Sequence, residues 1–130
     1  MTTTNALQTD ERHWEILCHL SPLLFLTGIP LANIVGPLAV WLYKKDQSGS
    51  VDLHGKESIN FQISLTLYLL VLGAVTAGLM FVLIGFLLVP ALIMALIAFP
   101  VIELVFILLG TLKAREGQVY RYPLTIRFIR

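Results

Sequence analysis

The feature that most constrains this chain is a run of 45 residues, Ser58–Ile102, without a single Asp, Glu, Lys or Arg. Glu103 interrupts the run, and apolar residues then continue from Leu104 to Leu112. A helix rises about 1.5 Å per residue, so one crossing of a bilayer core takes roughly 20 residues. The segment is therefore long enough for two crossings with a tight turn among the Gly and Pro residues of 85–90. We expect transmembrane helices over residues 59–84 and 88–112, because only helices satisfy the backbone of such segments in lipid.

The composition points to the same class of protein. The 130 residues are 57% hydrophobic and 13% charged, and a soluble domain carries about 25% charged residues. A chain this short cannot bury so much apolar surface within itself. This excludes a soluble enzyme and a disordered chain, and predicts one all-α integral membrane domain over residues 1–130. The Thr-rich residues 1–9 are expected to be a disordered tail.

The first charge-free stretch, residues 16–43, leaves two alternatives open. Gly28, Pro30, Asn33 and Gly36 lie at its centre, and proline both removes an N–H donor and clashes with the preceding turn. The stretch is either an N-terminal re-entrant hairpin of two half-helices, 16–26 and 34–43, or a third, kinked span. Each half-helix would rise only about 15–18 Å, half the thickness of a bilayer.

Basic residues predict the orientation. The loop 44–57 carries three lysines and the tail 113–130 carries five basic side chains, whereas the turn near 85–90 carries no charge. Positive segments stay in the cytoplasm. We therefore expect a multi-pass membrane protein with a cytoplasmic C-terminus.

The tail is expected to leave the last helix near Gly117, which is a plausible C-cap. Pro123 blocks a simple continuation of that helix. The tail should then lie along the cytoplasmic face, where its arginines meet lipid phosphates or the acids Asp46, Asp52 and Glu57.

Several blocks of the chain, spread over residues 10–127, resemble one widespread bacterial family. The blocks include Asp10-Glu11-Arg12-x-Trp14, His19-Leu20-Ser21, Ile29-Pro30-Leu31-x-Asn33, Trp41-Leu42-x-Lys44-Lys45-Asp46, His54-Gly55-Lys56-Glu57 and Tyr120-Arg121-Tyr122-Pro123. The family consists of small membrane proteins of unknown function, and it is related to the 20-kDa membrane subunit of the chloroplast inner-envelope import translocon. The resemblance implies a small helical protein of the bacterial inner (plasma) membrane with cytoplasmic basic segments, and it implies no established activity.

A set of polar residues in or beside the apolar stretches forms a candidate polar network: His19, Asn33, His54, Glu57, Asn60 and Glu103. His54 and Glu57 are three residues apart and can share a proton or a metal, but His-x-x-Glu alone is a weak signal. The simpler interpretation is a polar helix start that packs against neighbouring helices.

Glu103 is the member of this set that most needs an explanation, because it interrupts an apolar span. It lies ten residues before Lys113, or about 15 Å along a helix, and so near the middle of the bilayer. A charged carboxylate there costs roughly 2–3 kcal/mol or more. We expect Glu103 to face protein, near Asn33 or His19, and to hold helices together, so that Glu103→Leu loosens the assembly.

The sequence supports a non-enzymatic membrane subunit or accessory that assembles with itself or with a larger membrane partner. A transport or translocation path is one role that such an assembly could serve. The alternative is an ion relay or membrane enzyme centred on Glu103 with His54 and Glu57. No phosphate-binding loop, HExxH motif or Cys/His cluster occurs, so we expect no catalytic centre, cofactor or metal. With a net charge of +1, the partner we expect besides other protein chains is the lipid bilayer, and no nucleic acid.

Overall fold

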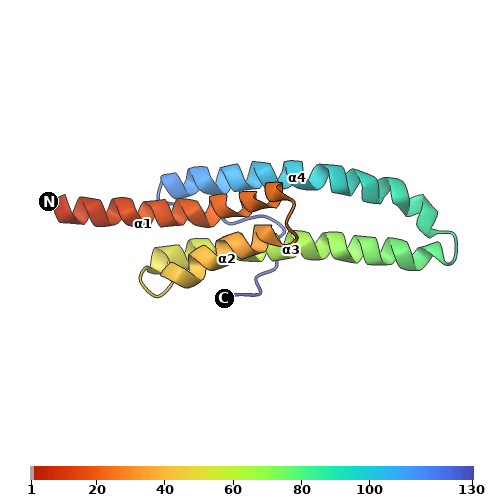
Figure 1. The fold of residues 1–130 in the computed structure, drawn as a ribbon, viewed down its shortest axis with the longest axis horizontal. Coiled ribbons are helices and arrows are strands. Elements are labelled where there is room, and N and C mark those ends of the chain that lie inside the picture. Colours follow the sequence, from red (N-terminus) through yellow and green to blue (C-terminus); the bar gives the residue numbers. More distant parts are fainter. Residues whose placement is uncertain (1) are drawn as a thin grey trace.

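The computed structural model describes residues 2–130 as four α-helices, one 3₁₀ helix and an extended C-terminal tail, with no strand among them (Figure 1). The order is α1 (Thr2–Leu20), η1 (Ser21–Thr27), α2 (Ala32–Lys44), α3 (Gly49–Met80) and α4 (Gly85–Arg115). The helices alternate in direction. The N-terminus, the α2–α3 loop and the end of α4 therefore lie at one end of the molecule (Figure 1).

Helices α3 and α4 form a long hairpin, and both are long and apolar enough to cross a membrane. Both are longer than the predicted spans. Helix α3 starts at Gly49, where Ser48 caps it by accepting a hydrogen bond from the Val51 N–H at 3.2 Å. The turn falls at residues 81–84, before the predicted 85–90. Gly85 instead starts α4 so close to α3 that an added Cβ would lie 2.5 Å from the Thr76 carbonyl oxygen.

The tip of this hairpin is entirely apolar. Its four residues, Phe81, Val82, Leu83 and Ile84, are all exposed. Leu83 has a φ of 63°, a left-handed conformation that costs a leucine roughly 1–2 kcal/mol. A leucine in this position is better suited to contact with lipid than with water.

The chain reverses between η1 and α2, at the breakers that the sequence places there. Gly28 and Leu31 have φ values of 75° and 61°, and α2 starts at Ala32. Asn33 Nδ2 donates to Gln62 Oε1 of α3 at 3.0 Å, so the elbow lies partway along α3. Neither arm is among the candidate spans, and the position of residues 16–43 relative to a bilayer stays a prediction.

Helix α1 begins at Thr2, where the sequence predicts a disordered tail over residues 1–9; Met1 lies outside the described residues. Residues 4–10 are exposed, so they extend the helix without packing. The extension is compatible with their sequence, because residues 4–9 contain neither Pro nor Gly.

One packed bundle fills the end of the molecule that holds both termini. Helix α1 lies against the first half of α3 and the last half of α4, and helix α2 lies against α1 and the first half of α3. Beyond the elbow the α3–α4 hairpin continues alone (Figure 1). The bundle core contains Cys18, Val51, Ile59, Ile107 and Tyr122.

The tail leaves α4 as predicted. Helix α4 ends at Arg115, and Gly117 has a φ of 75°. The Gln118 N–H bonds back to the Lys113 carbonyl at 2.9 Å, which is the helix-ending arrangement that glycine favours. The tail then returns along α3.

Candidate functional site

The bundle contains a chain of buried polar side chains drawn from three elements. His19 of α1 and His54 of α3 are both fully buried, and His19 Nε2 lies 2.9 Å from His54 Nδ1. The other ring nitrogen of His19, Nδ1, lies 2.6 Å from the Tyr122 hydroxyl of the tail. At the far end, His54 Nε2 lies 3.9 Å from Glu15 Oε2. The order is thus Tyr122, His19, His54, Glu15.

Only one assignment of protons suits every contact in this chain. A carboxylate at Glu15 favours an N–H on His54 Nε2, which makes His54 Nδ1 an acceptor. His19 then donates from Nε2 and accepts from the Tyr122 hydroxyl at Nδ1. With both histidines neutral, each of the two hydrogen bonds of His19 has one donor and one acceptor, whereas His54 Nε2 and Glu15 Oε2, 3.9 Å apart, are too distant for a hydrogen bond. The chain fastens the tail to α1 and α3.

Burial, assisted by the neighbouring His54, lowers the pKa of His19 to about 3. His19 belongs to α1, outside the two candidate spans. Burial also raises the pKa of the Tyr122 hydroxyl, which therefore stays protonated. The geometry and these pKa shifts agree that His19 and Tyr122 are uncharged.

We expect the folded protein to lose stability as pH falls below 6.5. The unfolded chain binds a proton at His19 with a pKa of about 6.5, whereas the folded chain resists it down to a pH of about 3. Stability is therefore fully present above pH 6.5, and it falls by about 1.4 kcal/mol for each pH unit below that. Melting in detergent at pH 7.5 and pH 5.0 measures the effect. His19→Gln should show a smaller fall, and an identical fall in both proteins would contradict the assignment.

A second buried polar group lies beside the elbow. Glu103 is fully buried, as predicted. No hydrogen bond within the described residues satisfies either Glu103 oxygen or the side-chain nitrogen of Gln62. Asn33 itself bonds to Gln62 at 3.0 Å and to Thr66 at 3.4 Å. The predicted role of Glu103 in holding helices together therefore has no hydrogen bond to support it.

We expect Glu103→Leu to leave the melting temperature unchanged or to raise it. An apolar side chain of similar size removes a buried polar group that has no partner, and such changes are close to neutral or stabilising. This reverses the expectation drawn from sequence. Ile107→Ala, another fully buried position of α4, should cost about 2–5 kcal/mol and shows that the assay responds. Strong destabilisation by Glu103→Leu would mean that the carboxyl is bonded in the folded protein.

The remaining two predicted residues hold the tail. Arg127 donates to both carboxyl oxygens of Glu57, at 2.8 and 3.2 Å. The Asn60 side-chain amide donates to the Ile129 carbonyl and accepts from the Ile129 N–H, each at 2.9 Å. One turn further along α3, Ser64 Oγ accepts from the Ile126 N–H at 2.8 Å. This face of α3 acts as a docking strip for the tail.

The six predicted residues thus form three groups, and no hydrogen bond or ion pair within the described part of the chain joins Glu103 to His54 or Glu57. The sequence-based network omits Glu15, Gln62, Tyr122 and Arg127. Glu15 could have been found, since it lies four residues before His19 and so on the same face of a helix. The Arg127–Glu57 pair agrees with the expectation that tail arginines meet Glu57, whereas the contact of Tyr122 with His19 carries no local signal.

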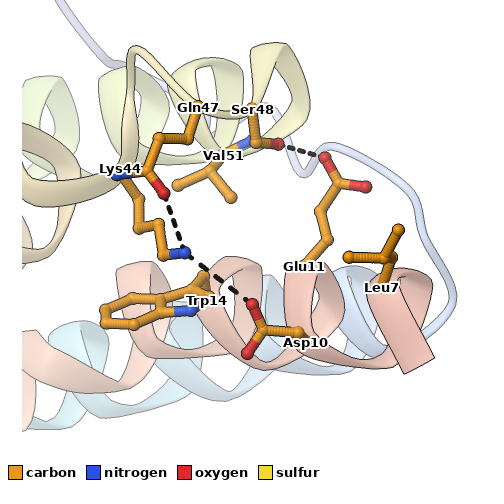
Figure 2. A pocket seen from close by; sticks show the side chains of 8 residues that line it. All are labelled: Leu7, Asp10, Glu11, Trp14, Lys44, Gln47, Ser48 and Val51. Atoms are coloured by element: carbon orange, nitrogen blue, oxygen red, sulfur yellow. Dashed lines mark hydrogen bonds and ion pairs between the residues drawn. The ribbon is translucent and has the colours of Figure 1, made fainter. Parts of the chain in front are cut away.

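An open pocket of about 330 Å³ lies at the N-terminal end, between α1 and the α2–α3 loop (Figure 2). Lys44 Nζ lies 3.7 Å from an Asp10 oxygen and 3.1 Å from Gln47 Oε1, and it stands over the Trp14 ring. The Ser48 hydroxyl donates to Glu11. The blocks around Asp10 and Lys44 that carry the family resemblance meet here. Their charges bond to one another, so the pocket fastens α1 to the loop.

No group of three or more His, Cys, Asp or Glu side chains suited to a metal ion occurs within residues 2–130. The buried Cys18 is a free thiol, and burial raises its pKa to about 12. A thiol held in this state is a poor nucleophile.

Comparison with curated proteins gave no match, and neither did comparison with solved structures. No link to the chloroplast translocon subunit was found. A protein-family model does match residues 10–129, nearly the whole chain and almost the same range as the sequence resemblance. The chain belongs to the magnetosome magnetite crystal formation protein family, MamF/MmsF, a family of magnetosome membrane proteins.

Proposed function

We propose that this protein acts in magnetite crystal formation as a non-enzymatic membrane subunit, within a homo-oligomer or a larger membrane assembly. Membership of the family supports the process. One structural observation supports the non-enzymatic role: most of the buried polar side chains are bonded to other parts of the same chain. His19 binds Tyr122, Asn33 binds Gln62, and Glu57 binds Arg127.

The outer part of the hairpin supports the assembly. Only 11% of the most apolar window of each long helix is buried. An added Cβ at Gly73 or Gly78 would meet nothing within 4 Å. Small residues on an open helix face allow close approach of another transmembrane helix. Two transmembrane helices cannot enclose a transport path by themselves. The exposed outer surface of the hairpin is therefore where lipid and partner helices would pack.

We propose that the protein lies in the bacterial inner membrane or a membrane derived from it. The end of the molecule that holds both termini then faces the cytoplasm. The lysines of the α2–α3 loop and the basic tail lie at that end, and the opposite tip is apolar and uncharged. In this orientation the elbow beside Thr66 lies about 12 Å beyond Ser58, where the charge-free run begins. This depth fits a re-entrant hairpin that enters without crossing.

The orientation predicts the accessibility of single cysteines placed in a Cys18→Ser background, with the protein produced in the inner membrane of a host that forms no magnetosome vesicles. Gln47→Cys and Gln118→Cys should be protected from an impermeant thiol reagent in intact cells, and they should react after the cells are opened. Thr4→Cys should behave in the same way if residues 16–43 form a hairpin. Labelling of Gln47→Cys and Gln118→Cys from outside would reverse the orientation, and labelling of Thr4→Cys alone would indicate a third crossing.

The function is tested by deleting the gene in a magnetite-forming host and measuring crystal size by electron microscopy. We expect altered crystals in vesicles that still form, and rescue by the parental gene. Unchanged crystals would contradict the proposed process. Native mass spectrometry of the rescuing protein from its own lipids tests the assembly, and a lone monomer that rescues fully would contradict it.

The same strain tests the ion relay, which one observation favours: the buried, unbonded carboxyl of Glu103. A structural role predicts that both Glu103→Gln and Glu103→Leu restore normal crystals. A relay predicts that both variants fold and that neither restores them.

A further inference from the structure

The returning tail forms a basic pocket with the start of α3. The cavity holds about 300 Å³, and four basic side chains line it against one carboxylate, Glu57. The four are Lys56, Arg121, Arg127 and Arg130. The lining therefore carries a charge of about +3, since four positive charges outnumber one negative charge.

Two of the four cations are already occupied. Arg127 holds Glu57 through two hydrogen bonds, and Lys56 Nζ lies 2.6 Å from Asp52. The side chains of Arg121 and Arg130 are exposed, and they make no ion pair or hydrogen bond within the part of the chain that the structure describes. The pocket thus presents two free guanidinium groups, and its one acid is neutralised by Arg127.

The pocket is also partly apolar. Leu53, Val119 and Ile129 line it beside the arginines. Glu57 immediately precedes the charge-free run that starts at Ser58, so the pocket lies where the membrane surface is expected. The neighbouring tail residue Phe128 exposes an apolar side chain. A ligand that fits both kinds of lining has an anionic group joined to an apolar body.

We propose that this pocket binds the phosphate of an anionic phospholipid headgroup, with Arg121 and Arg130 as its ligands. Guanidinium groups match phosphate oxygens with paired hydrogen bonds. Basic pockets at the cytoplasmic ends of transmembrane helices are suited to such headgroups. The Glu57–Arg127 pair positions the tail, so the site exists only while the tail is docked on α3.

The test measures lipid binding to the full-length protein in detergent micelles by native mass spectrometry. Phosphatidylglycerol should bind tightly and phosphatidylcholine weakly. The double variant Arg121→Gln with Arg130→Gln should weaken phosphatidylglycerol binding about thirty-fold, because each arginine near a membrane surface contributes about a factor of five. The matched control is Lys113→Gln with Arg115→Gln, which removes the same charge from residues outside the pocket and should keep parental binding.

Equal losses in the two double variants would overturn the site and indicate general surface charge. Equal binding of both lipids by the parent would overturn it as well. Inorganic phosphate at about 10 mM, a concentration chosen for this test, distinguishes a free phosphate ion from a lipid headgroup as the ligand of the pocket. Displacement of the lipid by phosphate, with an equal thermal shift by phosphate alone, would assign the pocket to a free anion. The melting temperatures of all variants should match the parent, since the substituted pocket residues are exposed.

Discussion

Tyr122→Ala is expected to destabilise the protein by about 3–5 kcal/mol, the usual cost of removing a buried aromatic side chain. The Tyr122 ring is 2% exposed, and it stacks on Phe61 with ring centroids 4.3 Å apart. Its loss leaves a cavity among α1, α3 and α4 and also releases the tail from His19. Thermal melting and the yield of folded protein in detergent measure the effect.

Two further variants divide this effect between the ring and the hydroxyl. Tyr122→Phe keeps the ring but leaves His19 Nδ1 without its donor, which should cost about 1–3 kcal/mol. Phe128→Ala removes an aromatic side chain of the same tail that is 52% exposed, and should change stability by less than about 0.5 kcal/mol. Equal effects at positions 122 and 128 would show that the tail is not docked as described.

Gly36→Ala should be the most damaging single-methyl change in the elbow. Its Cβ would lie 2.5 Å from the Ser21 carbonyl oxygen and 2.9 Å from the Ser21 carbonyl carbon. These atoms belong to the backbone of η1, which cannot turn aside as a flexible side chain can. We expect a loss of about 1–3 kcal/mol or more from overpacking, seen as a lower melting temperature and a lower folded yield.

Gly73→Ala is the matched control, since it makes the same change within a helix. Nothing lies within 4 Å of the added Cβ at that position, and alanine is favoured over glycine in a helix by about 0.5–1 kcal/mol. The control should therefore keep or improve stability. If Gly36→Ala melts at the parental temperature, α2 and η1 do not pack as closely as the structure has them.

The elements that sequence predicts well here are those with local causes. A long charge-free run indicates two apolar helices, Gly28 and Pro30 break the first stretch, and Gly117 ends the last helix. The turn of the hairpin was misplaced because Gly85 suggests a loop, whereas its missing side chain serves the close approach of α4 to α3. The polar sequence of residues 1–9 predicts a disordered tail, whereas α1 starts at Thr2. Once the packed part of a helix is formed, exposed polar residues can extend it without an apolar face.

The candidate site was harder to predict, because its contacts join distant parts of the chain. His19 meets Tyr122, and Glu57 meets Arg127, across 103 and 70 residues. The depth of Glu103 was judged from Lys113, although α4 begins at Gly85, about 27 Å away along the helix. Helix α4 is longer than a bilayer core is thick, so the depth of Glu103 in a membrane stays a prediction.

The bond between His19 and Tyr122 has a consequence for how the protein is made. Ribosomes add about 5–20 residues per second, so His19 is synthesised on the order of 5–20 s before its partner. The hairpin of α3 and α4 can insert during this interval, but the tail cannot complete the core of the bundle until it has emerged. A nascent chain stopped before Tyr122 would therefore be a membrane-inserted protein with an open, polar cleft, the kind of product that cellular proteases remove. The tail thus completes a structure that begins with the first helix.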